Sequence, residues 1–158
     1  MIADALASTL ATTANAAEVG GTGLILVTGG RARAIGGSDQ PSMALAGAQV
    51  TMGSGPAFRS MVSGEPVAIH DVVADYPFGH PELAPYSGPV HAILSVPIRI
   101  DAVVTGALDL YDHTAHGWPA RKLTAGRELA QVMAAVLHLL ASDPAEAAVS
   151  GSFSGVPQ

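Results

Sequence analysis

Three histidines near the middle of the chain have side chains suited to ligand chemistry. His70 precedes the segment 72–91, His80 lies within it and His91 ends it. A neutral imidazole at such a place could be the axial ligand of a haem, although loop histidines also serve as ordinary hydrogen-bonding residues. Haem further needs a large apolar cavity. The side chains that could contribute to one are Phe58, Met61, Phe78 and Tyr86.

A second group of candidate ligands, Asp112, His113 and His116, brings a carboxylate and two imidazoles close together. These are donors that divalent transition metals use. Two histidines three residues apart bind one ion well only on a helix, and we expect a loop here. We therefore interpret the group as solvated surface residues and predict no metal site.

Three features that resemble catalytic or phosphate-binding elements have simpler interpretations. Gly53–Pro56 lacks the lysine and hydroxyl residue that follow in a phosphate-binding loop, and Pro56 supplies no amide donor, so we predict a structural turn. Asp71 follows a predicted strand and is expected to cap backbone N–H groups in the next turn. The serines, Ser54 among them, have no adjacent histidine–acid pattern, so a serine hydrolase has no support.

The segment 72–91, called the lid below, is long and contains four prolines. Loops of this length are usually lids or binding loops, or are disordered. Tyr76, Phe78 and Tyr86 argue against disorder because large rings are normally buried. We predict that the lid covers a ligand pocket. Its predicted lining residues are Phe58, Met61, Asp71, Tyr76, Phe78, His80, Tyr86 and His91.

Composition restricts the classes of function. The chain has 158 residues, enough for one domain with a sizeable core. It has no cysteine, which removes disulfides, thiolate metal sites and cysteine nucleophiles. The net charge of −6, with scattered basic residues, argues against a nucleic-acid partner. The apolar run 129–141 is short for a membrane span and no basic region begins the chain, so we expect a cytoplasmic protein with no membrane partner.

Apolar spacing predicts helices at 2–18, 40–52, 57–62 and 119–141, and short strands at 22–28, 31–35 and 66–70. The segment 94–111 contains two apolar-rich runs on either side of Asp101-Ala102, which predicts an antiparallel hairpin. Residues 142–158 are rich in Ser, Gly, Ala and Pro, so we expect a disordered tail after a domain at 1–141.

The hairpin leaves two structural questions open. Ala102 at positive φ in a type I′ turn would cost about 1 kcal/mol, so we expect another turn type. Asp109 and Tyr111 alternate onto the same strand face. They either meet across a pocket wall or lie on the solvent side, because the register decides which face is buried.

The last helix has two apolar stripes and therefore needs two packing partners. One partner is a sheet, and the second is either the first helix or another copy of the chain. The residues predicted for a dimer contact are Leu129, Met133, Val136, Leu137 and Leu140.

Over residues 2–141 the chain resembles the GAF domain, and most closely the GAF modules that actinobacterial signalling proteins place ahead of an RNA-binding ANTAR domain. The matching pieces are Gln49, Gly53–Pro56, Gly64–Val67, Asp71, Tyr76-Pro77, Ser95–Pro97 and Gly106–Tyr111. The resemblance implies an α/β (α+β) fold with a central antiparallel sheet of five to six strands. The terminal helices would cover one face, and the short helices and the lid would enclose a pocket on the other.

GAF domains bind cyclic nucleotides, haem, bilins or other small molecules, and many dimerise through their terminal helices. The resemblance therefore implies a non-catalytic sensory domain that binds a small molecule under the lid and signals through a homodimer or a downstream partner protein. Alternatives are an interaction scaffold with an empty pocket and a haem-based gas or redox sensor. The absence of cysteine excludes a covalent bilin and the cysteine-dependent free methionine sulfoxide reductases of this fold. The identity of the cofactor or ligand is left open, and no ANTAR part is present in these residues.

Overall fold

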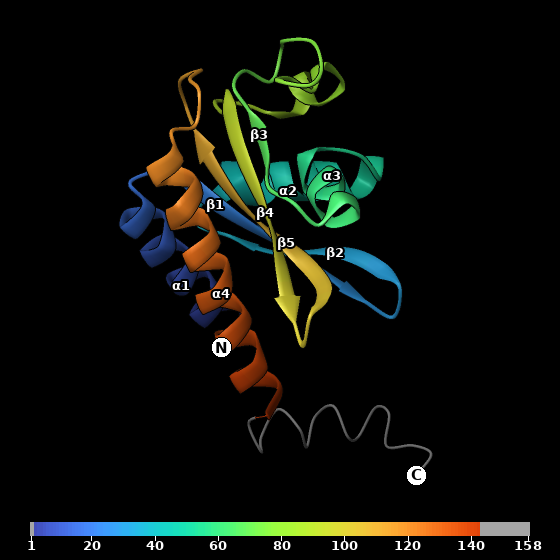
Figure 1. The fold of residues 1–158 in the computed structure, drawn as a ribbon, viewed down its shortest axis with the longest axis vertical. Coiled ribbons are helices and arrows are strands. Elements are labelled where there is room, and N and C mark those ends of the chain that lie inside the picture. The colour runs from blue at the N-terminus through green and yellow to red at the C-terminus, as the bar shows by residue number, and fades with distance from the viewer. Residues whose placement is uncertain (1, 143–158) are drawn as a thin grey trace.

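A computed structural model describes residues 2–142, whose five strands form one sheet in the order β2-β1-β5-β4-β3 (Figure 1). Every neighbouring pair is antiparallel. The elements are α1 (Ile2–Ala17), β1 (Gly21–Thr28), β2 (Arg31–Gly37), α2 (Gln40–Met52), α3 (Pro56–Ser63), β3 (Val67–Ile69), the 3₁₀ helix η1 (Pro81–Tyr86), β4 (Ala92–Ile100), β5 (Val103–Asp112) and α4 (Ala120–Ser142). The predicted fold class is confirmed. The predicted tail lies outside the described residues except for Ser142.

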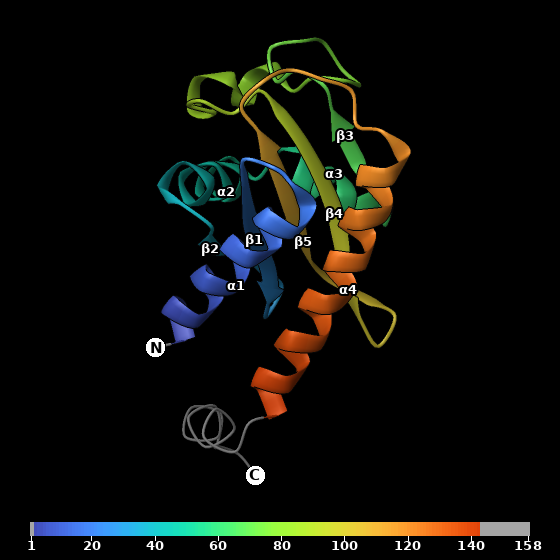
Figure 2. The same ribbon diagram turned by 90° about the vertical axis from the view of Figure 1, so that its left-hand side faces the viewer.

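The terminal helices α1 and α4 cover one face of the sheet, and α2 and α3 cover the other (Figure 2). This layering follows from alternation along the strands. Ile93 belongs to the core beneath the lid, whereas Leu94 belongs to the core beneath the terminal helices. Successive side chains of a strand point to opposite faces, so each central strand supplies both cores.

The terminal helices are joined to each other as well as to the sheet. Leu6 and Leu10 of α1 and Met133 of α4 lie in the same buried cluster. The Lys122 ammonium group of α4 also donates to the carbonyls of Ala17 and Glu18, both at 2.6 Å. A cation at this end of α1 satisfies carbonyls that have no partner within the helix.

The packing of α4 changes the expectation for its apolar stripes. Met133 is 1% exposed and lies inside the core of its own chain, so its assignment to a dimer contact is wrong. Leu129, Leu137 and Leu140 pack against the same core and are partly buried. The exposed large apolar side chains of α4 are Val132 and Leu139.

The β4–β5 turn differs from the prediction. Asp101 and Ala102 both have positive φ, 53° and 67°, which is the backbone of a type I′ turn. The right-handed twist of the paired strands favours this turn type, and it is adopted although alanine occupies the second position. No helix among residues 2–142 is long and apolar enough to cross a membrane.

Candidate functional site

In the structure the predicted pocket residues do not line one pocket but lie in several places. Tyr76 and His80 face each other beside α3, with ring centroids 5.1 Å apart. Phe58 lies on α3 next to a surface hollow, and Met61 packs against a different cluster of the core. Phe78 stacks on His70 at 4.6 Å.

The other predicted residues lie elsewhere on the lid. The Asp71 carboxylate is 3.6 Å from Nδ1 of His91 and also accepts from the backbone N–H of Val73 at 3.3 Å, as expected of a turn cap. Tyr86 lies at the end of η1 and is 56% exposed. Tyr76 and Phe78 are also about half exposed, at 49% and 54%. The expected burial of the lid aromatics is therefore wrong.

A group of polar side chains, here called the lid cluster, gathers where the lid meets α3. It consists of Ser54, Arg59, Tyr76, His80 and Glu82. Tyr76 donates to Glu82 at 2.5 Å, and the Arg59 guanidinium lies 5.5 Å from the centroid of the Tyr76 ring. Nε2 of His80 is 3.2 Å from Oγ of Ser54. These residues are far apart in sequence, and the folding of the lid back onto α3 brings them together.

The lid cluster contains two buried nitrogen atoms without a hydrogen-bond partner among the described residues, Nη1 of Arg59 and Nδ1 of His80. His80 is only 2% exposed. Buried polar atoms are normally paired, and one that is not calls for an explanation in strain, an unseen water or a ligand. Both atoms lie in the lid cluster, where the lid meets α3, so they mark a place where a ligand could bind.

The electrostatics of the lid cluster keep His80 neutral and Glu82 ionised. Burial lowers the pKa of His80, with Glu82 opposing and Arg59 adding to that shift. The hydrogen bond from Tyr76 lowers the pKa of Glu82 and raises that of Tyr76. A neutral imidazole has one donor and one acceptor nitrogen, so the cluster can both donate to and accept from a small molecule.

A hollow of about 350 Å³ adjoins the lid cluster and is bounded by the α2–α3 turn and by α3. Phe58 and Val62 contribute apolar walls, and Ser54 and Arg59 contribute polar groups. This mixture of apolar walls and a few polar groups is typical of small-molecule sites. Sequence reasoning did not place Arg59 or Ser54 in the pocket, because Arg59 belongs to no local motif and Ser54 was interpreted as part of the structural turn Gly53–Pro56.

The Ser54–His80 contact has the distance of a nucleophile and its base. A catalytic serine also needs a third group that orients the base. Nδ1 of His80, the atom that such a group would contact, has no partner among residues 2–142. We therefore interpret the pair as a hydrogen bond within the lid cluster.

The interior between α2, α3 and the sheet holds a second polar group, here called the Asp109 network. The carboxylate of Asp109 is 1% exposed. It accepts from the Ser95 hydroxyl at 2.5 Å, the Gln49 amide at 2.8 Å and the Tyr111 hydroxyl at 3.0 Å. Asp109 and Tyr111 therefore lie on the interior face of β5, which answers the question that the sequence left open.

The rest of the Asp109 network joins α2 and α3 to the sheet. The carbonyl oxygen of the Gln49 side chain accepts from the Ala57 backbone N–H at 2.9 Å, and Ser60 lies 3.1 Å from Ser95. Burial raises the pKa of Asp109, and the three hydrogen bonds oppose that rise. Burial also raises the pKa of Tyr111.

The space beneath the lid does not fit a haem. Apolar side chains that are at most 1% exposed fill it. They are Leu45, Ile69, Val72, Leu83, Val90, Ile93 and Tyr111. His91 and His70 lie outside this interior, and the single buried histidine, His80, contacts Ser54. A planar ring system would have to displace the core, so we do not assign haem to this chain.

Asp112 and His116 of the second predicted ligand group contact each other in the structure. Nε2 of His116 is 2.6 Å from Oδ2 of Asp112, and its Nδ1 is 2.8 Å from the Gly117 carbonyl. Both ring nitrogens thus have protein partners. Within residues 2–142, no three or more His, Asp or Glu side chains are grouped so that they could hold a metal ion.

Comparison with known proteins supports the same fold. The family model described as GAF domain matches residues 2–138. No curated protein matches the sequence. Three similar solved structures share 20% identity or less with the chain, so they bear on the fold alone.

The first is a type II free methionine-R-sulfoxide reductase from Thermoplasma acidophilum, with a TM-score of 0.67 and 12% identity over 86% of this chain and 92% of that one. The second is a domain of a two-component sensor histidine kinase protein from Sinorhizobium meliloti, with a TM-score of 0.67 and 16% identity over 91% and 96%. The third is the GAF domain of a phosphoenolpyruvate-protein phosphotransferase from Coxiella burnetii, with a TM-score of 0.67 and 20% identity over 90% and 85%.

Proposed function

The chain belongs to the GAF domain family, and from that premise we propose that it is a non-catalytic sensory domain that binds a small molecule at the lid. The signal would pass through a homodimer or a partner protein. A cytoplasmic location and kinship with the GAF modules of actinobacterial signalling proteins are parts of the same proposal.

The observation that supports ligand binding is the pair of buried nitrogen atoms without partners in the lid cluster. The guanidinium of Arg59 is a donor only, so it calls for an oxygen acceptor such as a carbonyl or carboxylate. Nδ1 of His80 would pair with a second polar atom of the same ligand. The hollow beside Phe58 has room for a small organic body. The ligand class is therefore a small, polar, oxygen-bearing molecule.

Binding would require a movement of the lid, because both nitrogen atoms are covered. Arg59 also donates to the Pro77 carbonyl at 3.2 Å, and the backbone N–H of His80 donates to the Val72 carbonyl at 3.0 Å. Pro77 accepts from Nη2 of Arg59, so a ligand oxygen that accepts from the unpartnered Nη1 would add a second bond to the same guanidinium and, through His80, join α3 to the lid. Occupancy of the site would thus change how firmly the lid is held, and such a difference between two states is what a sensor needs.

This site can be tested by nuclear magnetic resonance with acetate, benzoate, glycine and L-methionine as probes. At least one probe should shift the backbone signals of Ser54, Arg59 and His80. Arg59→Gln should abolish that shift, whereas Arg31→Gln, the same change at the exposed β1–β2 turn, should retain it. If no probe shifts these signals, or if Arg59→Gln binds unchanged, the lid site is wrong.

A protein-interaction scaffold is the second candidate function, and the Asp109 network favours it. The network is buried and each carboxylate oxygen has a partner, so the interior behind the lid is already filled. Failure of every probe at the lid would support this alternative. Haem is not proposed, for the packing reason given above.

The absence of catalysis is also open to a direct test. Two similar structures are free methionine-R-sulfoxide reductases. This chain has no cysteine, so it has no thiol to attack a sulfoxide. Incubation with free methionine-R-sulfoxide and dithiothreitol should produce no methionine above the reductant alone. Methionine formed in proportion to the protein would refute the non-catalytic assignment.

Dimerisation through α4 rests on its exposed apolar side chains. Val132 and Leu139 are 55% and 68% exposed and lie seven residues apart, on the same side of the helix. Leu139→Glu should shift the sedimentation equilibrium toward monomer. His138→Glu, a change at an exposed neighbour, should leave it unchanged. Equal assembly of Leu139→Glu and the unaltered protein would contradict a dimer through this face.

A further inference from the structure

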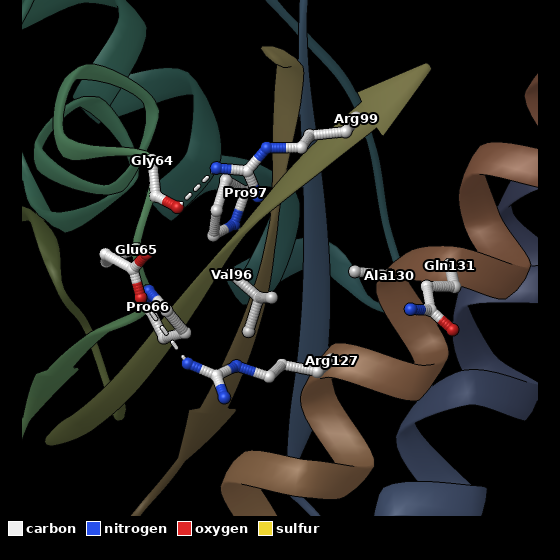
Figure 3. Close-up of a pocket in the computed structure, with 9 residues that line it drawn as sticks. All are labelled: Gly64, Glu65, Pro66, Val96, Pro97, Arg99, Arg127, Ala130 and Gln131. Atoms are coloured by element: carbon white, nitrogen blue, oxygen red, sulfur yellow. Dashed lines mark hydrogen bonds and ion pairs between the residues drawn. The ribbon is translucent and has the colours of Figure 1, made fainter. Parts of the chain in front are cut away.

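A cleft of about 440 Å³ lies between β4 and α4 at the edge of the sheet (Figure 3). It is separate from the lid cluster. It exists because β3 is short. The pairing of β3 with β4 stops at Val67 and Ser95, and β4 continues for five more residues to Ile100. The helix α4 passes beside this uncovered part of β4. Strand edge and helix form the two walls of the cleft.

The cleft has a mainly polar lining with two cationic side chains. Val96 and Ala130 close its bottom but are only 2% and 4% exposed, so partly buried Pro66 offers its apolar surface. Arg99 extends from β4 and Arg127 from α4, and both line the cleft (Figure 3). The two guanidinium groups therefore come from independent elements of the fold.

The two arginines have different bonds to the protein. Arg99 donates to the Gly64 carbonyl at 2.6 Å, and a side chain at Gly64 would begin 2.7 Å from its Nη2 atom. Arg99 is thus committed to the α3–β3 turn. Arg127 has only a long contact, 3.5 Å, from its Nη2 atom to the Glu65 carboxylate. The side chains of Arg127 and Glu65 are 54% and 72% exposed, so water screens this pair strongly.

Glu65 indicates which chemical group the cleft can bind. Its carboxylate is already held against Arg127 at the rim, and the planar guanidinium fork matches the geometry of a carboxylate. The pair is weak enough to be exchanged for another carboxylate. A ligand that placed its carboxylate at Arg127 and its apolar body against Pro66 would gain both contacts. Glu65 would then turn outward to solvent.

We propose that this β4–α4 cleft is a second small-molecule site, which takes an organic carboxylate with an apolar body in exchange for Glu65. The site is independent of the lid cluster, because no residue lines both the cleft and the hollow beside α3. Its position gives it a regulatory role. Glu65 follows α3 by one turn and Arg127 lies on α4, so occupancy changes the link between the helix that bears Arg59 and the terminal helix.

The test is a titration of the protein with sodium benzoate, followed by ¹H–¹⁵N spectra. Benzamide has the same ring without the charge and is the matched neutral probe. Benzoate should shift the signals of Glu65, Arg127 and Gln131, and benzamide should not. Sodium chloride is held at about 0.1 M, where the Debye length is about 10 Å and distant charges contribute little.

Three variants separate this proposal from nonspecific attraction. Arg127→Gln should weaken benzoate binding about tenfold, as expected for the loss of a hydrogen bond between charged groups. Glu65→Gln should strengthen it about threefold, because the internal competitor is an exposed ion pair. Arg121→Gln removes the same charge elsewhere on α4 and should change the affinity less than about twofold.

The proposal is overturned if benzamide binds as well as benzoate, if Arg127→Gln binds unchanged, or if Glu65→Gln weakens binding. Arg127 is exposed, and the spectrum of the variant itself verifies that the fold is intact. Arg59→Gln distinguishes the two proposed sites. In that variant the shifts at Glu65 and Gln131 should persist, whether or not the lid site has been lost.

Discussion

The Asp109 network and the lid cluster are both polar groups on the α2–α3 side of the sheet, yet they are built in opposite ways. In the network, both oxygens of a buried carboxylate accept hydrogen bonds from side chains of three elements. In the lid cluster, two buried nitrogens have no partner among the described residues, and the neighbouring Tyr76 ring is half exposed. One group is complete within the chain and the other is not.

The hydrogen bonds of the Asp109 network stabilise the fold, whereas the lid cluster has polar atoms that no described protein group uses. A buried carboxylate without hydrogen-bond partners would destabilise the fold by roughly several kcal/mol. Its partners must therefore come from the protein itself. In the lid cluster the two covered nitrogen atoms stay without a partner among the described residues until the lid moves. A ligand would supply the partners. The comparison therefore assigns a structural role to Asp109 and supports the binding role that we propose for Arg59 and His80.

Removal of the buried carboxylate should have the largest effect. We expect Asp109→Ala to lower the free energy of unfolding by about 3 kcal/mol, because Ser95, Gln49 and Tyr111 would lose their common acceptor. Urea denaturation measures the change. Asp109→Asn keeps one acceptor oxygen and should cost about 1 kcal/mol. An Asp109→Ala protein with an unaltered midpoint would show that the network is dispensable.

The two groups should also differ in the sign of their pH dependence. The pKa of Asp109 is raised above 3.8, so its contribution to stability is full below that pH and is lost as pH rises through the folded pKa. The pKa of His80 is lowered below 6.5, so its contribution is full above that pH and is lost as pH falls through the folded pKa.

Urea denaturation at a series of pH values can resolve these slopes. Asp109→Asn should remove the decrease of stability that begins above pH 3.8 in the unaltered protein. His80→Gln should remove the increase of stability that approaches completion near pH 6.5. If both substitutions flatten the same part of the curve, the two groups are coupled and the contrast between them fails.

The smallest effect is expected at the rim of the lid cluster. Tyr76→Phe removes the hydrogen bond to Glu82, but both side chains are exposed, so the urea midpoint should stay within experimental error. Leu83→Ala, a change in the buried core beneath the lid, is the matched comparison and should lower the midpoint clearly. A loss in Tyr76→Phe as large as that in Leu83→Ala would mean that the lid cluster supports the fold.

The sequence predicted the architecture well because the patterns that indicate helices, strands and turns involve residues close together in the chain. The order of helices and strands and the paired glycines at 29–30 depend on neighbours in the chain. Local patterns could not show which face of the sheet carries Asp109. Register shifts at Leu24/Ile25 and at Ile98/Arg99 displace one strand against the next. A shift of one residue exchanges the two faces of a strand.

The candidate site was predicted only in part, for a related reason. Tyr76 and His80 were expected in a pocket and do lie together, but Arg59 joins them through the fold of the lid alone. The rings at 76, 78 and 86 were expected to be buried because rings usually are. In the structure Leu83, Val72 and Val90 fill the interior beneath the lid, and the rings are left half exposed.

The shortness of β3 has a consequence for how copies of the chain can meet. An unpaired strand edge invites a strand from another molecule and thereby aggregation. On β4 that edge carries Pro97, which has no N–H to offer, and Arg99, which projects a charge across it. The opposite edge, on β2, exposes Arg31 and Arg33. Both borders of the sheet are therefore poor templates for a foreign strand, which favours the helices for the contact between copies that we propose.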